Sequence, residues 1–157
     1  DVLYDLEDVY YIFTMPNADS NGRIIKQMID KFVSVNNKRS IGLVSMGYIN
    51  YISTLQYVDG VVGNSSSGLL EAPTFKIGTI NIGDRQKGRI KAKSVIDCEP
   101  TKKSLIDAVN TLYSKEFKSI LNTVENPYGR GDAVCKIIDV IKKQPIPMDQ
   151  KKEFYDL

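Results

Sequence analysis

Short apolar runs rich in β-branched residues alternate with segments whose apolar residues recur at helical spacing, and this alternation constrains the fold most strongly. The runs lie at residues 9–14, 41–45, 60–63, 79–82 and 94–98. Predicted helices lie at residues 24–33, 48–57, 66–75, 102–113 and 133–141, and residues 1–6 are typical of the end of another helix. Short apolar strands between helices, the first strand expected to be buried on both faces, indicate a parallel sheet covered on both sides. The pattern therefore predicts one α/β domain with a Rossmann-like parallel sheet.

Composition removes several classes of function. The 157 residues include no histidine, so this chain holds no histidine base, no Ser-His-Asp triad and no histidine metal site. The 21 basic residues balance 19 acidic ones, which argues against a nucleic-acid partner, and no apolar run is long enough to span a membrane. The two cysteines, Cys98 and Cys135, lie far apart and outside any CxxC pattern, which favours reduced, buried thiols in a cytoplasmic protein.

The segment richest in chemistry follows the predicted strand 60–63. There Ser65, Ser66 and Ser67 precede a glycine and open a predicted helix, with Glu71 one turn later. Free N–H groups and hydroxyls at a helix start suit a phosphate, and a nearby carboxylate accepts hydrogen bonds from ribose hydroxyls. The pattern is neither a Walker loop nor a GxGxxG fingerprint. An ordinary serine cap followed by a solvated acid stays open as the alternative.

A second loop follows the next strand, at residues 83–89. It is basic and bounded by glycines, and Arg85 or Arg89 is placed to reach a phosphate held by the serines. Because both loops follow neighbouring strands at the carboxyl edge of a sheet, we expect them to face one site. A solvated loop with exposed basic side chains is the alternative.

Seven segments together resemble the hydrolysing UDP-N-acetylglucosamine 2-epimerases, enzymes that start sialic-acid and related nonulosonic-acid synthesis. They are residues 16–19, 63–68, 71–73, 81–86, 88–89, 126–129 and 154–156. The resemblance extends over nearly the whole chain. It implies the C-terminal, UDP-binding domain of a GT-B architecture, in which two Rossmann-like domains enclose the active site.

The resemblance also implies a substrate site, with no cofactor and no metal. The phosphates are expected to bind at Ser65 and Ser66, with Ser67 beside them and Arg85 on the phosphate side. The ribose is expected to bind at Glu71, and Asn17 is expected to face the cleft. The uracil is expected to contact Ser45 and Met46. In the full enzyme the C2 proton of the sugar is removed while UDP leaves by anti elimination. Water then adds to the glycal, which gives N-acetylmannosamine and UDP.

Two departures from the family pattern lead to further expectations. In the family, the catalytic carboxylates lie in an N-terminal domain, and the C-terminal domain opens with a strand and a His-Pro loop. This sequence shows neither that N-terminal domain nor the opening strand and His-Pro loop. We therefore expect an incomplete domain at residues 1–143, inactive alone, and a tail at 144–157 that crosses to the missing domain. Either the strand at 10–14 pairs directly with that at 61–63 or another segment fills the gap, and open strand edges favour a homo-oligomer or low stability.

Two other functions remain open from the sequence. A GT-B glycosyltransferase would share the serines and the glutamate but transfer its sugar to an acceptor, and the loop at residues 84–86 favours the epimerase instead. A non-catalytic α/β binding or receiver module would need acidic strand ends, whereas these strand ends carry Asn, Ser and Arg. The sequence does not choose between N-acetylglucosamine and a diamino sugar of the bacillosamine type.

Overall fold

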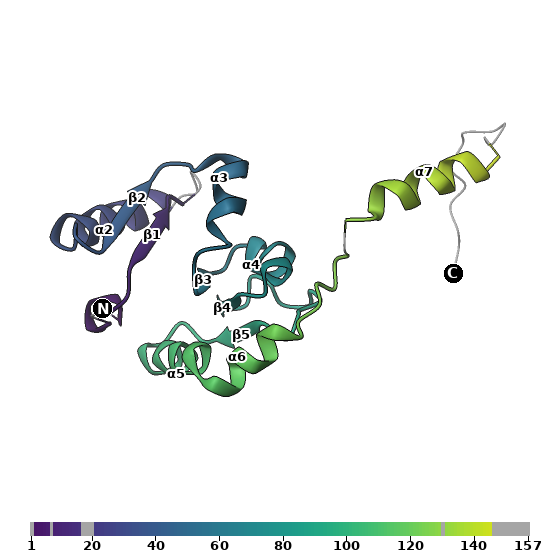
Figure 1. Cartoon of the computed structure of the whole chain (residues 1–157). Helices are drawn as coiled ribbons and strands as arrows, with labels where there is room; N and C mark the ends of the chain where they lie inside the picture. Colours follow the sequence, from purple (N-terminus) through teal and green to yellow (C-terminus); the bar gives the residue numbers. More distant parts are fainter. Residues whose placement is uncertain (1, 7, 17–20, 130, 146–157) are drawn as a thin grey trace, which may run out of the picture.

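The computed structural model describes residues 2–6, 8–16, 21–129 and 131–145. Its elements are, in order, α1 (Val2–Asp5), β1 (Tyr11–Thr14), α2 (Gly22–Val35), β2 (Ser40–Leu43), α3 (Gly47–Thr54), β3 (Gly60–Gly63), α4 (Ser67–Leu70), the 3-10 helix η1 (Ala72–Phe75), β4 (Gly78–Ile82), β5 (Val95–Cys98), α5 (Lys102–Tyr113), α6 (Lys115–Asn122) and α7 (Ala133–Lys143). All strand pairs run parallel, and helices cover both faces of the β3–β4–β5 sheet. The predicted α/β, Rossmann-like class is confirmed (Figure 1).

The β3–β4–β5 sheet carries the best-packed part of the chain. Its central strand β4 is buried along most of its length because its side chains alternate between two covered faces. On one face, Ile80 packs against α5 and α6 in a buried cluster completed by Cys98, Ala108, Leu112 and Phe117. On the other face, Thr79 donates a 2.8 Å hydrogen bond to the carbonyl of Gly68 in α4. The loops that follow the carboxyl ends of these strands therefore begin at a rigid layer.

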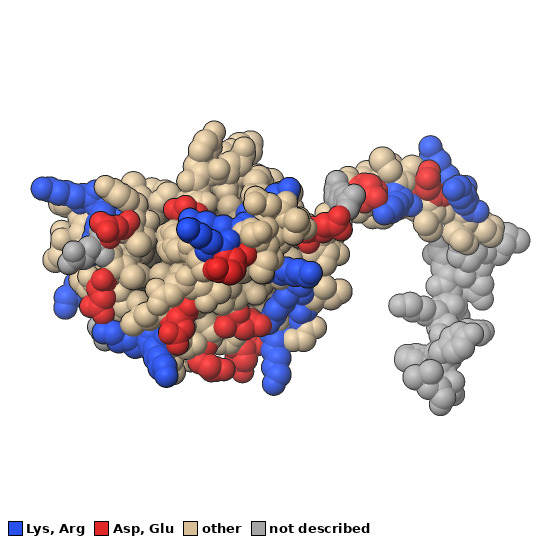
Figure 2. Space-filling view, turned by 60° about the horizontal axis from the view of Figure 1, so that its bottom comes forward, with Lys and Arg blue, Asp and Glu red and all other residues tan. Residues whose placement is uncertain are grey.

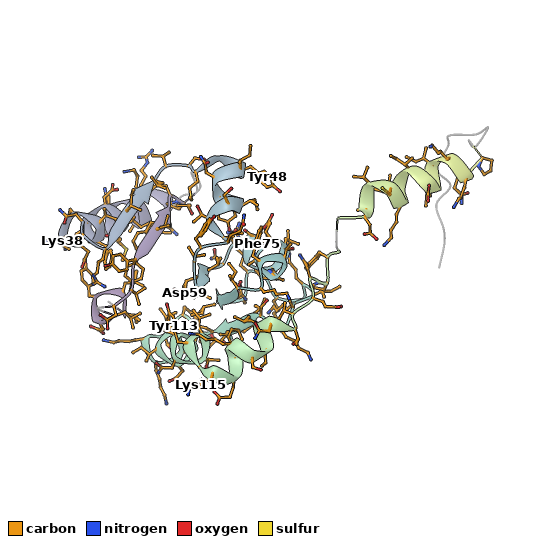
Figure 3. The ribbon with its side chains drawn as sticks, in the orientation of Figure 1. Lys38, Tyr48, Asp59, Phe75, Tyr113 and Lys115 are labelled. Atoms are coloured by element: carbon orange, nitrogen blue, oxygen red, sulfur yellow. The ribbon has the colours of Figure 1, made fainter. Side chains whose placement is uncertain are left out.

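The second face of this sheet also holds α3 and η1 in place. Leu55, Ala72 and Ile77 form the buried cluster there, and Tyr51 and Phe75 pack against it. Figure 3 shows Phe75 beside α3, whereas Tyr48 stands at the outer start of that helix and is 75% exposed. Helix α3 is thus packed along its C-terminal half and open to solvent at its N-terminal end.

The β1–β2 sheet is covered on one face only. Helix α2 covers that face through buried Phe32, whose ring lies edge-on to Tyr11 and Phe13. On the opposite face Ile12 and Ile41 are 47% and 49% exposed. The prediction that the first strand is buried on both faces is therefore wrong, because no described element packs on the side of Ile12.

The two sheets do not join in the part of the chain that the structure describes, where β1 pairs only with β2, and β3 only with β4. Of the two alternatives left open by the sequence, the direct pairing of β1 with β3 is therefore wrong. Helix α1, expected from the sequence as a helix end, links the two parts instead. Its Asp5 forms a 2.7 Å ion pair with Lys102 of α5, and its Leu3 carbonyl accepts a 3.3 Å hydrogen bond from the Tyr11 hydroxyl.

Two helices differ from the sequence-based prediction. The helix expected at 66–75 is a four-residue α4 followed by η1, because Pro73 stands where an α-helix would need a backbone N–H donor. Helix α6, not predicted, begins after Ser114, whose hydroxyl accepts a 3.1 Å hydrogen bond from the N–H of Phe117. Helix α7 forms as predicted, but it stands apart from the body with its residues exposed (Figure 1).

Charge is mixed over the surface. Figure 2 shows basic and acidic side chains interspersed across the visible face of the body, in keeping with a formal net charge of +2. None of the helices within the described ranges has the length and apolar character needed to cross a membrane.

Candidate functional site

The serine loop, defined here as residues 64–67, connects β3 to α4 at the carboxyl edge of the sheet. Ser65 is exposed and Ser66 is half-buried. Among the described residues, the backbone N–H groups of Ser65 and Ser66 have no hydrogen-bond partner, and the Ser66 hydroxyl makes no cap bond to α4. The middle of the loop therefore presents hydroxyl and amide donors that a ligand oxygen can accept from.

Helix α4 itself contributes less than the sequence suggested. It spans only Ser67–Leu70, and the helix dipole scales with aligned peptide units, so its field at the loop is small. The sequence predicted that the start of a ten-residue helix would attract an anion, and the short α4 weakens that prediction. The donors of the loop and a nearby cation have to supply the attraction.

Ser67 differs from its two neighbours because its hydroxyl pairs with a side chain of another element, whereas the Ser65 hydroxyl only accepts a 3.4 Å hydrogen bond from the N–H of Ser67 within the loop. Its Oγ forms a hydrogen bond with the hydroxyl of Tyr51 on α3. The next residue, Gly68, must be glycine, since a Cβ there would lie 2.4 Å from Cγ2 of Thr79. Asn126 holds the far end of α4 through a 2.8 Å hydrogen bond to the Leu70 carbonyl. The helix that follows the serine loop is thus fixed at its start, along its side and at its end.

The basic loop after β4 reaches the serine loop. Gly83 and Gly88 bound it with φ angles of 75° and 80°, which favour glycine. Exposed Arg85 places Nη1 3.4 Å from Oδ1 of Asn64, and buried Gln86 donates from Nε2 to the Asn64 carbonyl at 2.7 Å. The structure therefore brings Arg85 to the serine loop.

Glu71 follows α4 directly and is half-buried. Its Oε2 is buried and has no hydrogen-bond partner within the described residues. A buried carboxylate oxygen without a donor is costly, and a hydroxyl group is a suitable donor for it.

Two other predicted contacts lie at the start of α3. Ser45 is exposed and its Oγ accepts a 3.2 Å hydrogen bond from the N–H of Gly47, while Met46 is half-buried. Asn17, the predicted cleft residue, lies outside the described residues. Within the described residues no hydrogen bond joins Ser45 or Met46 to the serine loop, and α3 is the element that connects them.

Two hollows lie elsewhere on the surface. One of about 310 Å³ is lined by α1, the end of β4 and the start of α5. One of about 670 Å³ is lined by the basic loop, including Arg89, and by Lys91 and Asp97. Neither of these two hollows is lined by the serine loop or by Arg85.

An ion pair borders the larger hollow. Lys91 Nζ lies 2.7 Å from Asp97 Oδ1, which also accepts a 2.7 Å hydrogen bond from buried Asn81. Partial burial raises the pKa of Asp97, but the hydrogen bonds from Lys91 and Asn81 outweigh it and hold that pKa below its ordinary value. This cluster was not found from the sequence, because it depends on the register that sets Asn81 beside Asp97.

The cysteines and acidic residues add no further site to the described ranges. Within these, no group of three or more Cys, Asp or Glu side chains is placed to hold a metal ion. Cys98 and Cys135 are both free, and Cys98 is buried as expected. Cys135 is exposed, so the expectation of two buried thiols is wrong for it, because α7 does not pack on the body.

Comparison with known proteins decides the family. A sequence profile described as UDP-N-acetylglucosamine 2-epimerase matches residues 1–142. The chain belongs to this family. The resemblance carried by the serine loop and the basic loop is thereby confirmed. The site geometry described above is therefore compared with the enzymes of this family.

Two relatives illustrate the range of the family. The polysialic acid biosynthesis protein P7 of Escherichia coli is 36% identical over 148 residues, which are 94% of this chain and 37% of that protein. The hydrolysing GDP/UDP-N,N'-diacetylbacillosamine 2-epimerase of Campylobacter jejuni is 40% identical over 113 residues, 72% of this chain and 29% of that protein. The matched part of the chain thus spans 37% and 29% of the length of these relatives.

Solved structures of the family share the fold. A structure of the UDP-GlcNAc 2-epimerase of Methanocaldococcus jannaschii in complex with UDP-GlcNAc and UDP superimposes with a TM-score of 0.69 at 20% identity. The match covers 90% of this chain and 37% of that one. A second structure of the same archaeal enzyme gives a TM-score of 0.64 at 21% identity.

Proposed function

We propose that this chain is the UDP-binding part of a hydrolysing UDP-N-acetylglucosamine 2-epimerase. One observation carries the proposal: Arg85 contacts Asn64 of the serine loop, so that two loops that follow neighbouring strands meet at one edge of the sheet. Membership of the epimerase family and the archaeal relative's complex with UDP-GlcNAc and UDP support a nucleoside diphosphate as the ligand. The naming of another relative for a diacetylbacillosamine substrate keeps a diamino sugar as the second candidate.

In this proposal the residues share the work of holding the leaving group. Ser65 and Ser66 donate hydroxyl and amide hydrogens to the diphosphate, and the Arg85 guanidinium adds a positive charge on the same side. Glu71 accepts hydrogen bonds from the ribose hydroxyls, which satisfies its unpartnered oxygen. Ser45, Met46 and Asn17 complete the site at the uracil and in the cleft.

The reaction assigned to the full enzyme breaks two bonds of the UDP-sugar. A base removes the proton at C2 while the bond from C1 to the UDP oxygen breaks, and the electron pair leaves with UDP. Water then adds to the resulting glycal and gives the free 2-epimer. Donors fixed around the diphosphate stabilise the negative charge that develops as UDP departs, so they lower the barrier of the elimination.

A second domain of the same enzyme is part of the proposal, because the chain covers only 37% and 29% of the two relatives described above. That domain would supply the catalytic carboxylates and the other wall of the cleft. Residues 1–143 would form the UDP-binding domain and residues 144–157 a tail that crosses to the partner domain. We also propose a homo-oligomer in the cytoplasm, in keeping with the two free cysteines.

The test is a product assay with the full-length protein and UDP-N-acetylglucosamine, followed by UDP titration of two variants. We expect free N-acetylmannosamine and UDP as products, and a weaker affinity for UDP in Ser66→Ala and Glu71→Ala, each by roughly tenfold. Transfer of the sugar to an acceptor would assign the chain to a glycosyltransferase instead. Unchanged UDP affinity in both variants would remove these residues from the site.

A further inference from the structure

The serine loop is held at both ends by side chains that belong to other parts of the chain. At its start, Gln86 Nε2 donates to the Asn64 carbonyl at 2.7 Å. At its end, the Tyr51 hydroxyl forms a hydrogen bond with Ser67 Oγ. Between these anchors, Ser65 and Ser66 keep their backbone N–H groups free of partners within the described residues. The anchors therefore fix the loop without using the donors in its middle.

Each anchor also ties the loop to another group of the proposed site. Gln86 is the immediate neighbour of Arg85, so the contact that holds the loop start also sets the distance of the guanidinium from the loop. Tyr51 lies on α3, whose first residue follows Met46, so the second contact connects the phosphate end of the site to its uracil end.

Both anchoring side chains are built into packed surroundings. Gln86 is 3% exposed, and its Oε1 is buried without a partner among the described residues, which costs folding stability. Tyr51 packs its ring on the cluster of Leu55 and Ala72, so its hydroxyl is carried by a fixed ring. Groups that must place a ligand to within a fraction of an ångström need such support from their neighbours.

We propose that Tyr51 and Gln86 are positioning residues for diphosphate binding, and that Ser67 serves as the acceptor or donor for Tyr51 rather than as a ligand of the phosphates. The inference rests on the proposed function, since it presupposes that UDP binds at the serine loop. It separates the three serines into two that contact the diphosphate, Ser65 and Ser66, and one that holds the loop.

The test compares UDP with uridine as ligands of the full-length protein by calorimetric titration. Tyr51→Phe removes one hydroxyl, and we expect it to weaken UDP binding about three- to tenfold while uridine binding stays unchanged, because uridine has no diphosphate. Tyr57→Phe is the matched control, since Tyr57 lies just beyond the same helix and is 87% exposed. It should bind both ligands as the wild type does.

Two further variants keep the test independent of folding. Ser67→Ala should reproduce the effect of Tyr51→Phe, and the double variant should be no weaker than either, because both remove the same hydrogen bond. Gln86→Met removes the donor to Asn64 together with the unpartnered oxygen. It should therefore weaken UDP binding while the thermal unfolding temperature holds or rises.

The outcomes separate this inference from the proposed function. A wild-type protein that does not bind UDP would overturn the proposed function and this inference with it. A wild type that binds UDP, with Tyr51→Phe at wild-type affinity or weakened equally for UDP and uridine, would overturn the positioning role alone. Additive losses in the double variant would make Ser67 a ligand in its own right.

Discussion

The two sheets of this chain differ in how completely they are covered. The β3–β4–β5 sheet is packed on both faces, and its Ile80 is 0% exposed, whereas the β1–β2 sheet leaves Ile12 47% exposed on its open face. The serine loop and Arg85 follow strands of the better-covered sheet, although Val62 at its β3 edge is 52% exposed, and Ser45 and Met46 follow the half-covered one. The groups proposed to hold the charged diphosphate thus rest on the more rigid layer, where a fixed geometry matters most.

The largest expected difference between the two sheets comes from removing a core side chain from each. Ile80→Ala should lower the free energy of unfolding by about 2–5 kcal/mol, because it leaves a cavity between two covered faces. Ile12→Ala should cost less than about 1 kcal/mol, since much of that side chain already meets water. Urea denaturation followed by circular dichroism measures both. Equal losses would mean that the two sheets are equally buried in solution.

A second comparison uses one glycine from each sheet. A Cβ on Gly78 of β4 would lie 2.2 Å from Cδ1 of Leu112 and 2.9 Å from the ring of Phe117, so Gly78→Ala should destabilise by about 1–3 kcal/mol. A Cβ on Gly42 of β2 would lie 3.0 Å from the flexible end of Met15 and at an ordinary contact distance of 3.7 Å from Ile29 and Val33. Gly42→Ala should therefore stay within about 1 kcal/mol of the wild type. Urea denaturation of both variants measures these losses in the free energy of unfolding. A larger loss for Gly42→Ala than for Gly78→Ala would mean that the β1–β2 sheet is the more tightly packed of the two.

The smallest expected effect is the contribution of Asp97 in β5 to the pH dependence of the free energy of unfolding. Burial raises the pKa of Asp97, but Lys91 and Asn81 lower it further, to below the ordinary value of 3.8. A lowered pKa means that Asp97 contributes stability above about pH 4, and that this contribution is lost as the pH falls through the folded-state pKa. The carboxylate is 56% exposed, so solvent screening keeps the effect modest.

Two variants isolate that contribution. Asp97→Asn should flatten the decline in stability between about pH 5 and pH 3, measured as the midpoint of urea denaturation at each pH. Lys91→Met should flatten it as well, because the carboxyl loses its ammonium partner. A decline as steep as that of the wild type in both variants would show that this ion pair contributes no pH dependence.

Local sequence signals were enough to predict much of the fold. The five strands and most helices were expected close to their observed positions, because short β-branched runs and helical spacing are local patterns. Helix α6 was missed although Ser114 at its N-cap and Phe117 within its first turn were available as signals. The break between α4 and η1 could also have been predicted from the sequence, since Pro73 stands inside the segment expected to be one helix.

Tertiary relations could not be predicted in the same way. The division into two sheets depends on which strand edges meet, and no residue in β1 or β3 specifies its neighbour alone. The hydrogen bond from Tyr51 to Ser67 joins residues on two elements whose approach is set by the cluster around Leu55. The hydroxyl partner of Tyr51 therefore became visible only in the structure.

A structure of the full-length protein with UDP bound would test the proposed site directly. We expect the diphosphate oxygens within hydrogen-bond distance of Ser65, Ser66 and the Arg85 guanidinium, with the ribose hydroxyls at Glu71. A structure in which UDP occupies another place, while Ser66 and Arg85 remain without contact to it, would contradict the central claim.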